Sequence, residues 1–207
     1  MPFSVSRFSS PALLVVDMQN DFVRQGAPME VPDARASLEN HRRLIACFRG
    51  IGAPVVYTKF LATDRPSLLW LWSRQCEPPT SACRRGVRRR YLDCADDIEC
   101  TDVVREICPE EGDLVVEKYG YGSFHGTGLS DRLREMRVAS LVVTGTVTQI
   151  CVEETAREAF HNGFATTLVA DAVSSFAADL HAATLKNFAM KFGWVDDCET
   201  VIRNLTT

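Results

Sequence analysis

The chain has 207 residues, of which 46% are hydrophobic and 24% charged, and its formal net charge is −4. These values are ordinary for a globular protein with a sizeable apolar core. The slight negative charge provides no basic field for nucleic acid, and no apolar run reaches the eighteen residues that a membrane span needs. The N-terminal segment has no signal-peptide pattern, so we expect a cytoplasmic protein without nucleic-acid or membrane partners.

Segments typical of strands and helices alternate along the chain. Apolar runs typical of buried strands occupy residues 12–16, 54–60, 113–118, 138–144 and 164–170. Helical patterns occupy residues 33–48, 101–107, 130–136, 151–161 and 177–191, and a short strand is expected at 200–202. Residues 18–33 are expected to form a loop, with Asp33 capping the first helix. The alternation predicts a three-layer α/β/α fold with a mostly parallel, doubly wound sheet of about six strands.

A long irregular segment at about residues 61–99 interrupts this alternation, within what we expect to be a single domain spanning residues 1–207. We call this segment the insert. Its basic cluster is either a solvated face or a site for an anion or a partner: Arg84, Arg85, Arg88, Arg89 and Arg90. Its Trp70 and Trp72 fit a lid, an oligomer contact or core packing equally well.

The chain contains eight cysteines: Cys47, Cys76, Cys83, Cys94, Cys100, Cys108, Cys151 and Cys198. Free thiols are expected, because the chain is neither small nor visibly secreted. The spacing within residues 76–108 fits no common zinc pattern, so no structural metal is expected. A protein that senses redox state or acts as a scaffold is an alternative, and it would form reversible disulfides within that segment.

Three chemically active side chains stand at the ends of predicted strands. Asp17 follows residues 12–16, Lys118 ends residues 113–118, and Cys151 lies at the turn-to-helix junction after residues 138–144. We expect them to converge, because ligand sites of open α/β sheets lie at the carboxyl ends of the strands. The first helical turn is expected to favour the Cys151 thiolate as nucleophile. Asp17 would then be the general base and acid, and Lys118 its electrostatic support.

Each of these residues also has an ordinary structural interpretation: a core cysteine, an aspartate at a turn and a solvated lysine. A cysteine nucleophile is usually paired with a histidine, and His125, in the glycine-rich segment after Lys118, is the alternative base.

Three segments carry a resemblance to a known family: ALLVVDMQNDFV, LVVEKYGYGSFHGTGL and VTGTVTQICVEETAREAFHNGF. Over nearly its whole length the chain resembles the isochorismatase-like cysteine hydrolases, which include nicotinamidases, N-carbamoylsarcosine amidases, and ureidoacrylate and biuret hydrolases. The resemblance implies a catalytic triad of Asp17, Lys118 and Cys151. It also implies a non-proline cis peptide at Thr146–Val147, an oxyanion hole formed by the N–H groups of Val147 and Cys151, and Phe22 in the substrate pocket. Dimers or tetramers are expected on the same basis.

The chain also departs from this pattern. Nicotinamidases of the family carry an Asp-x-His metal site after the second strand, whereas YTKFLATDRP here has no histidine, so no metal or other cofactor is expected. Gly120 stands where many relatives have an arginine, and the insert is atypical. Vinyl-ether hydrolases of the family typically lack the cysteine. Cys151 therefore favours hydrolysis of a C–N bond in a small amide, ureide or carbamoyl compound through an acyl-enzyme, with vinyl-ether hydrolysis as the alternative.

Overall fold

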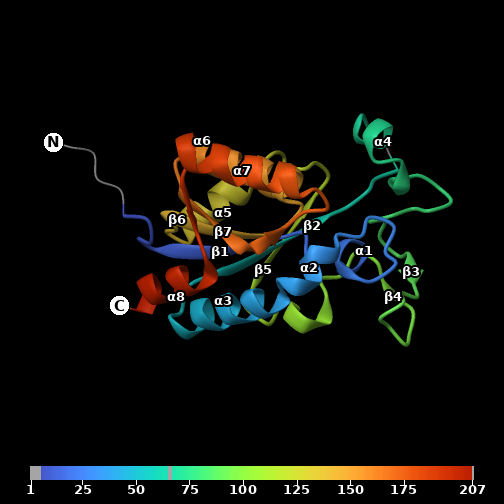
Figure 1. Cartoon of the computed structure of the whole chain (residues 1–207), viewed down its shortest axis with the longest axis horizontal. Helices are drawn as coiled ribbons and strands as arrows, with labels where there is room; N and C mark the ends of the chain where they lie inside the picture. The colour runs from blue at the N-terminus through green and yellow to red at the C-terminus, as the bar shows by residue number, and fades with distance from the viewer. Residues whose placement is uncertain (1–5, 65–66, 207) are drawn as a thin grey trace.

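A six-stranded sheet forms the centre of the protein in the computed structural model, which describes residues 6–64 and 67–206 (Figure 1). Its strands are β1 (Pro11–Val16), β2 (Val55–Phe60), β5 (Leu114–Lys118), β6 (Ser140–Thr146), β7 (Ala165–Ser174) and β8 (Trp194–Asp196). They lie in the order β5-β2-β1-β6-β7-β8, and every neighbouring pair is parallel. The predicted fold class is thereby confirmed.

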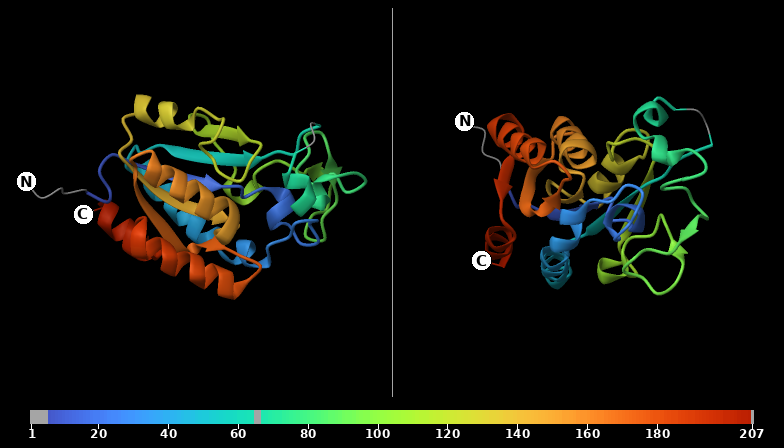
Figure 2. Two further views of the ribbon diagram at one scale, coloured as in Figure 1. Left: turned by 90° about the horizontal axis from the view of Figure 1, so that it is seen from above. Right: turned by 45° about the vertical axis from the view of Figure 1, so that its right-hand side comes forward.

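Helices cover both faces of this sheet (Figure 2). One face carries α2 (Pro32–Ala36), α3 (Leu38–Gly50) and α8 (Cys198–Thr206), and the other carries α5 (Leu129–Glu135), α6 (Glu153–His161) and α7 (Ala178–Lys191). Successive residues of β1 divide between the two cores: Leu13 packs with the α3 side and Leu14 with the α5 and α6 side. Among the described residues, no helix is long and apolar enough to cross a bilayer.

The C-terminal segment differs from the prediction. The strand expected at 200–202 is wrong, because these residues lie within α8, whose Val201 is buried in the core. The last strand is instead β8, where Trp194 pairs with Thr167 of β7. A short apolar stretch is compatible with either a strand or one face of a helix, so the local pattern did not separate the two.

The N-terminal helices also differ. The helix expected at 33–48 is broken at Ser37, whose hydroxyl donates to the carbonyl of Ala34. Asp33 is not the cap, because α2 already begins at Pro32, a residue suited to a first helical turn. The expected loop at 18–33 contains the short helix α1 (Asn20–Val23), and the helix expected at 101–107 is reduced to a 3₁₀ turn, η2 (Arg105–Ile107).

β1 and β6 approach each other closely just before their carboxyl ends. Val16 and Gly145 are register partners, and Gly145 has a φ of +115°. A Cβ atom at position 145 would lie 2.1 Å from the carbonyl oxygen of Val16, so only glycine fits there. This close approach brings the segment after β6 beside Asp17, which directly follows β1.

The insert lies beyond the carboxyl end of β2 and contains α4 (Leu69–Trp72), the 3₁₀ turn η1 (Arg74–Cys76), and the antiparallel strands β3 (Arg88–Arg89) and β4 (Ile98–Glu99) (Figure 1). Asp21 of α1 anchors it. This buried carboxylate accepts hydrogen bonds from the Cys83 amide at 2.7 Å, Arg89 Nε at 3.0 Å and the Tyr91 hydroxyl at 2.7 Å.

The basic cluster of the insert is paired within the chain. Its contacts are Arg84 with Asp64, Arg85 with Glu117, Arg88 with the carbonyl of Asp97, Arg89 with Asp21, and Arg90 with the Asp97 carboxylate. Because each charge already has a partner, the cluster fits the solvated-face interpretation better than an anion site.

Candidate active site

Asp17 and Lys118 form a fully buried ion pair at the carboxyl ends of β1 and β5. Lys118 Nζ lies 2.7 Å from Asp17 Oδ2, and both side chains are 0% exposed. Asp17 Oδ1 accepts a hydrogen bond of 2.6 Å from the hydroxyl of Thr58 on β2, the strand between the two. The ammonium also donates to the carbonyl of Tyr121 at 2.5 Å. One carboxylate oxygen is thus fixed by Thr58, and the other has only an ionic contact with Lys118.

Cys151 completes this cluster from the segment after β6. It lies in η3 (Thr148–Val152), a π-helical turn that leads into α6, and is 4% exposed. Asp17, Lys118 and the Val147 amide are all close enough to act on the pKa of its thiol. The structure therefore brings together the thiol, carboxylate and ammonium that the sequence places at three separate strand ends.

Cys151 is a neutral thiol in this environment, contrary to the expectation of a resting thiolate. Burial raises the pKa of Cys151 to about 12; Lys118 and the Val147 amide act in the opposite direction, while the charge of Asp17 adds to the increase. The expectation assumed an accessible thiol at a helix N-terminus, where free N–H groups and the dipole stabilise the anion. Desolvation at a nearly inaccessible site outweighs that effect.

Lys118 stays protonated despite its burial. Desolvation opposes the ammonium, but the charge of Asp17, together with hydrogen bonds to Asp17 and Cys151, outweighs it and raises the pKa of Lys118 above its ordinary value. The resting site is therefore an ammonium–carboxylate pair beside a protonated thiol. Its net charge is close to zero, which is the least costly arrangement in a buried site.

Alkylation of Cys151 by iodoacetamide should report this protonation state. Since only the thiolate reacts, the rate should rise about tenfold per pH unit between pH 7 and 10 without a plateau, as expected for a pKa near 12. Mass spectrometry of the Cys151 peptide measures this rate, and the exposed Cys108 in the same sample controls for the reagent. A plateau below pH 9 would show that the resting form is a thiolate.

The peptide bond between Thr146 and Val147 is cis, at the position that the resemblance implies. It lies between the end of β6 and η3, directly before the turn that holds Cys151. The Val147 amide lies close enough to Cys151 to lower the pKa of the thiol. A backbone donor thus lies beside the Cys151 thiol.

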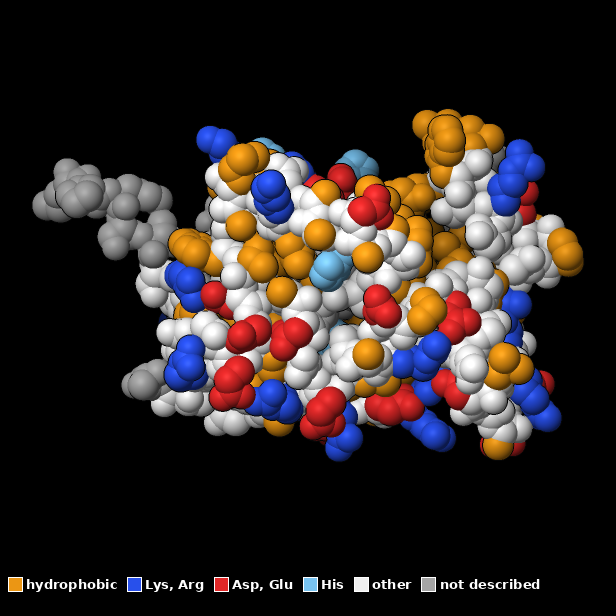
Figure 3. All heavy atoms as spheres, viewed as in Figure 1, with side chains coloured by type: hydrophobic (Ala, Val, Ile, Leu, Met, Phe, Trp, Pro, Cys, Tyr) orange, Lys and Arg blue, Asp and Glu red, His pale blue; other side chains and the backbone are white. Residues whose placement is uncertain are grey.

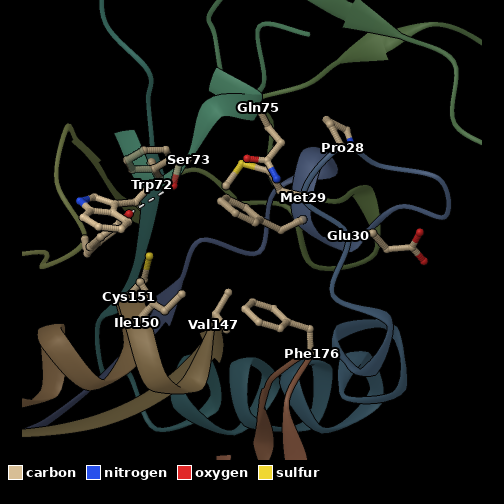
Figure 4. Close-up of a pocket in the computed structure, with 13 residues that line it drawn as sticks. Pro28, Met29, Glu30, Trp72, Ser73, Gln75, Val147, Ile150, Cys151 and Phe176 are labelled. Carbon is tan, nitrogen blue, oxygen red and sulfur yellow. Dashed lines mark hydrogen bonds between the residues drawn. The ribbon is translucent and has the colours of Figure 1, made fainter. Parts of the chain in front are cut away.

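A cavity of about 350 Å³ opens above Cys151 (Figure 4). Its lining comes from the segments that follow β1, β2, β5, β6 and β7: Phe22, Pro28, Met29, Glu30, Phe60, Trp72, Ser73, Gln75, Tyr121, Val147, Ile150, Cys151 and Phe176. Phe22 therefore lies where the resemblance places it. His125 is exposed and does not line the cavity, so the alternative base is not brought to the site.

Three lining residues, Trp72, Ser73 and Gln75, come from the insert, and the sequence analysis did not identify Ser73 or Gln75. Trp72 fits the lid interpretation, because it lines the cavity although it is 84% exposed, whereas Trp70 packs against the core. Figure 3 shows hydrophobic side chains gathered on α4 and in the hollow beside it. Within the insert, only the tryptophan pair, in a long loop after a central strand, indicated from sequence that this segment could reach the cavity.

The described residues do not fit the metal site that nicotinamidases of the family carry. No group of three or more histidine, cysteine, aspartate or glutamate side chains in residues 6–64 and 67–206 could hold a metal ion. Asp64, the acidic residue that follows β2, is paired with Arg84, and the only carboxylate in the cavity lining is Glu30. No chemical step is therefore assigned to a metal.

Two of the remaining cysteines are poorly suited to a redox role. All eight are free thiols in the structure. Within the insert and the segment after it, burial raises the pKa of Cys76 to about 11 and that of Cys100 to about 12. Such thiols are almost entirely protonated at neutral pH and react slowly with oxidants.

Comparisons with known proteins identify the family of this chain. Residues 11–200 match the family model described as the isochorismatase domain. Nicotinamidase 3 of Arabidopsis thaliana is 34% identical over 199 residues, which cover 94% of this chain and 88% of that protein. Ureidoacrylate amidohydrolase RutB of Variovorax paradoxus is 29% identical over 208 residues, which cover 95% and 81%.

A solved structure shows the same fold. The cysteine hydrolase from Pseudomonas syringae superimposes with a TM-score of 0.86 at 22% identity, covering 100% of this chain and 98% of that one. The match to the family model extends over most of the chain, from the first strand to α8. The protein therefore belongs to the isochorismatase family of hydrolases.

Proposed function

We propose that the protein hydrolyses a C–N bond in a small amide, ureide or carbamoyl compound through a covalent acyl-enzyme. The observation that carries this proposal is the buried Asp17–Lys118 ion pair, which acts on the Cys151 thiol at the floor of the cavity. Relatives named nicotinamidase and ureidoacrylate amidohydrolase support the same bond type.

In the first half-reaction, the sulfur of Cys151 attacks the carbonyl carbon while Asp17 takes the thiol proton. Because the thiol is neutral at rest, proton transfer must accompany attack rather than precede it. The negative charge moves to the carbonyl oxygen, where the N–H groups of Val147 and Cys151 would stabilise it. Collapse of this intermediate breaks the C–N bond, and the proton held by Asp17 passes to the leaving nitrogen.

In the second half-reaction, water attacks the thioester carbon and Asp17 accepts a proton from that water. The C–S bond then breaks, the acid leaves, and the proton returns to the sulfur of Cys151. Lys118 remains the partner of Asp17 through both half-reactions, because its buried ammonium lies 2.7 Å from the carboxylate. One water is consumed, and one amine or ammonia and one acid are formed.

The test combines product release with trapping of the intermediate. The protein is incubated with nicotinamide, benzamide, ureidoacrylate or N-carbamoylglycine, and the release of ammonia is measured. Reactions with those compounds that release ammonia are then quenched in acid, and the protein is examined by mass spectrometry. We expect ammonia release together with an acyl adduct on the peptide that contains Cys151.

The matched control is His125→Ala, which removes the alternative base. Because His125 is exposed and outside the cavity lining, this variant should retain ammonia release within about twofold of the parent rate. Ammonia release without an adduct on Cys151 would contradict the acyl-enzyme. Pyruvate release from isochorismate, with no ammonia from the panel, would favour vinyl-ether hydrolysis instead.

A further inference from the structure

Aromatic rings form a large part of the lining of the cavity above Cys151. Five of its thirteen lining residues are aromatic: Phe22, Phe60, Trp72, Tyr121 and Phe176. The Phe60 ring lies 6.4 Å from that of Phe22 and 6.3 Å from that of Tyr121, so these three form a continuous wall. Phe176 points into the cavity from the side of β7 (Figure 4). Such a lining suits a flat apolar group.

Positive charge is absent from the thirteen described residues of this lining. Lys118 does not line the cavity, and its ammonium is already paired with Asp17 and with the carbonyl of Tyr121. A carboxylate on the substrate would therefore lose water in the cavity without meeting any described cation, and such a loss is costly.

The single charged residue of the lining is acidic. Glu30 pairs with Arg35 at 2.7 Å and accepts the Gly26 N–H at 2.8 Å. The Gly26 hydrogen bond and Arg35 hold the pKa of Glu30 below its ordinary value, so Glu30 is ionised at neutral pH. Its carboxylate points away from the cavity, and Arg35 is engaged by Glu30 and the carbonyl of Val23 (Figure 4). Neither residue offers a positive charge to a ligand.

Two polar side chains of the cavity, those of Ser73 and Gln75, lie on the insert, opposite Cys151. The side chain of Gln75 points into the cavity from above, whereas Cys151 points up from below (Figure 4). The hydroxyls of Ser73 and Tyr121 lie 3.2 Å apart and satisfy each other. Among the described residues, the Gln75 amide makes no such bond, which leaves one acceptor and two donors for a ligand.

The position of Gln75 is set by the fold rather than by a free loop. Its own carbonyl accepts the Ala82 N–H at 2.8 Å. The residue after Ala82, Cys83, donates its own N–H to the buried carboxylate of Asp21. On the other side, the contact between Ser73 and Tyr121 ties the insert to the loop whose carbonyl binds Lys118. The roof of the cavity is therefore linked to both the first helix and the catalytic cluster.

We infer that the site takes flat amides that carry no negative charge, and that Gln75 is the specificity-determining residue at the end of the cavity opposite Cys151. This inference rests on the proposed function for its reacting bond. The aromatic wall holds the flat group, the neutral amide of Gln75 binds a polar edge of the substrate, and the missing cation excludes carboxylates. The insert thus determines which amides reach the nucleophile.

The test uses two probes that differ only in one carboxylate, benzamide and 4-carbamoylbenzoate. Binding to Cys151→Ala is measured by calorimetry, which does not depend on turnover, and kcat/KM is measured on the parent protein. We expect benzamide to be preferred at least about 30-fold in both measurements, because a buried unpaired charge is rejected more strongly than a change in size. Gln75→Arg should shift the ratio of the two probes toward the carboxylate by about 100-fold.

Leu68→Arg is the matched control, because it adds the same charge to the insert at an exposed position outside the cavity lining. It should leave the ratio unchanged within about twofold. Three results would each overturn the inference. The parent site could bind 4-carbamoylbenzoate as well as benzamide or better, it could bind neither probe, or Gln75→Arg could leave the ratio of the two probes unchanged. Selective binding of benzamide without turnover would instead support the inference and contradict the proposed function.

Discussion

Replacement of Cys151 by alanine is expected to lower kcat/KM for any hydrolysed amide by at least about 10⁴-fold while leaving the fold intact. In the proposed mechanism Cys151 is the only group of the cluster that forms a bond to the substrate, and loss of such a group removes most of the catalytic rate enhancement. Asp17 and Lys118 keep each other as partners, so no buried charge is left alone. The thermal midpoint should therefore change little.

Cys151→Ser separates nucleophilicity from shape. The serine hydroxyl is smaller than the thiol and far less acidic. The activity of Cys151→Ser should therefore fall nearly as far as that of Cys151→Ala. Cys108→Ala, at an exposed cysteine, is the control for removing a thiol elsewhere, and it should keep the parent rate. Ammonia release by Cys151→Ala at more than about one hundredth of the parent rate would contradict the covalent mechanism.

The positions of the reacting groups were predictable from sequence, because each depends on a local pattern and one general rule of topology. The apolar runs before Asp17 and Cys151 and the one ending at Lys118 define three buried strands, and parallel strands share one carboxyl edge. Their convergence required no knowledge of side-chain packing. The strand order β5-β2-β1-β6 then places the three ends within four consecutive strands, with only β2 between β5 and β1.

The protonation state of the site was not predictable in the same way. The pKa of Cys151 depends on how completely the surrounding chain excludes water, and that depth is a tertiary property. The local signal, a helix N-terminus, indicated the opposite direction. Sequence patterns therefore located the proposed nucleophile but indicated the opposite direction for the pKa of its thiol.

Two cavity residues of the insert, Ser73 and Gln75, could not be predicted from sequence for a related reason. Ser73 and Gln75 lie in an irregular segment, where no periodicity shows which side chains face inward. Their placement depends on contacts far along the chain, such as that between Asp21 and Cys83, and the hydroxyl pair of Ser73 and Tyr121. Such contacts follow from the folded structure alone.

Asp17→Asn should change the two reactions of Cys151 in opposite directions. The charge of Asp17 and its hydrogen bond both raise the pKa of the thiol, whereas the charge of Lys118 lowers it. With asparagine, the ammonium of Lys118 is left to stabilise the thiolate, so alkylation by iodoacetamide at pH 7.5 should become at least about tenfold faster. Amide hydrolysis should nevertheless fall about 10³-fold, because no base remains to carry the proton to the leaving nitrogen.

Lys118→Met is the informative counterpart, because it should slow both reactions. It removes the cation that lowers the pKa of the thiol and leaves the Asp17 carboxylate buried without its partner, at a cost of about 3–5 kcal/mol in unfolding free energy. The double variant Asp17→Asn/Lys118→Met removes both charges, so it should recover much of that stability but none of the activity. Chemical denaturation, alkylation and ammonia release measure the three effects separately. Slower alkylation in Asp17→Asn, or hydrolysis near the parent rate, would show that Asp17 is not the proton acceptor. A base in that role is expected both to suppress the resting thiolate of Cys151 and to be required for turnover.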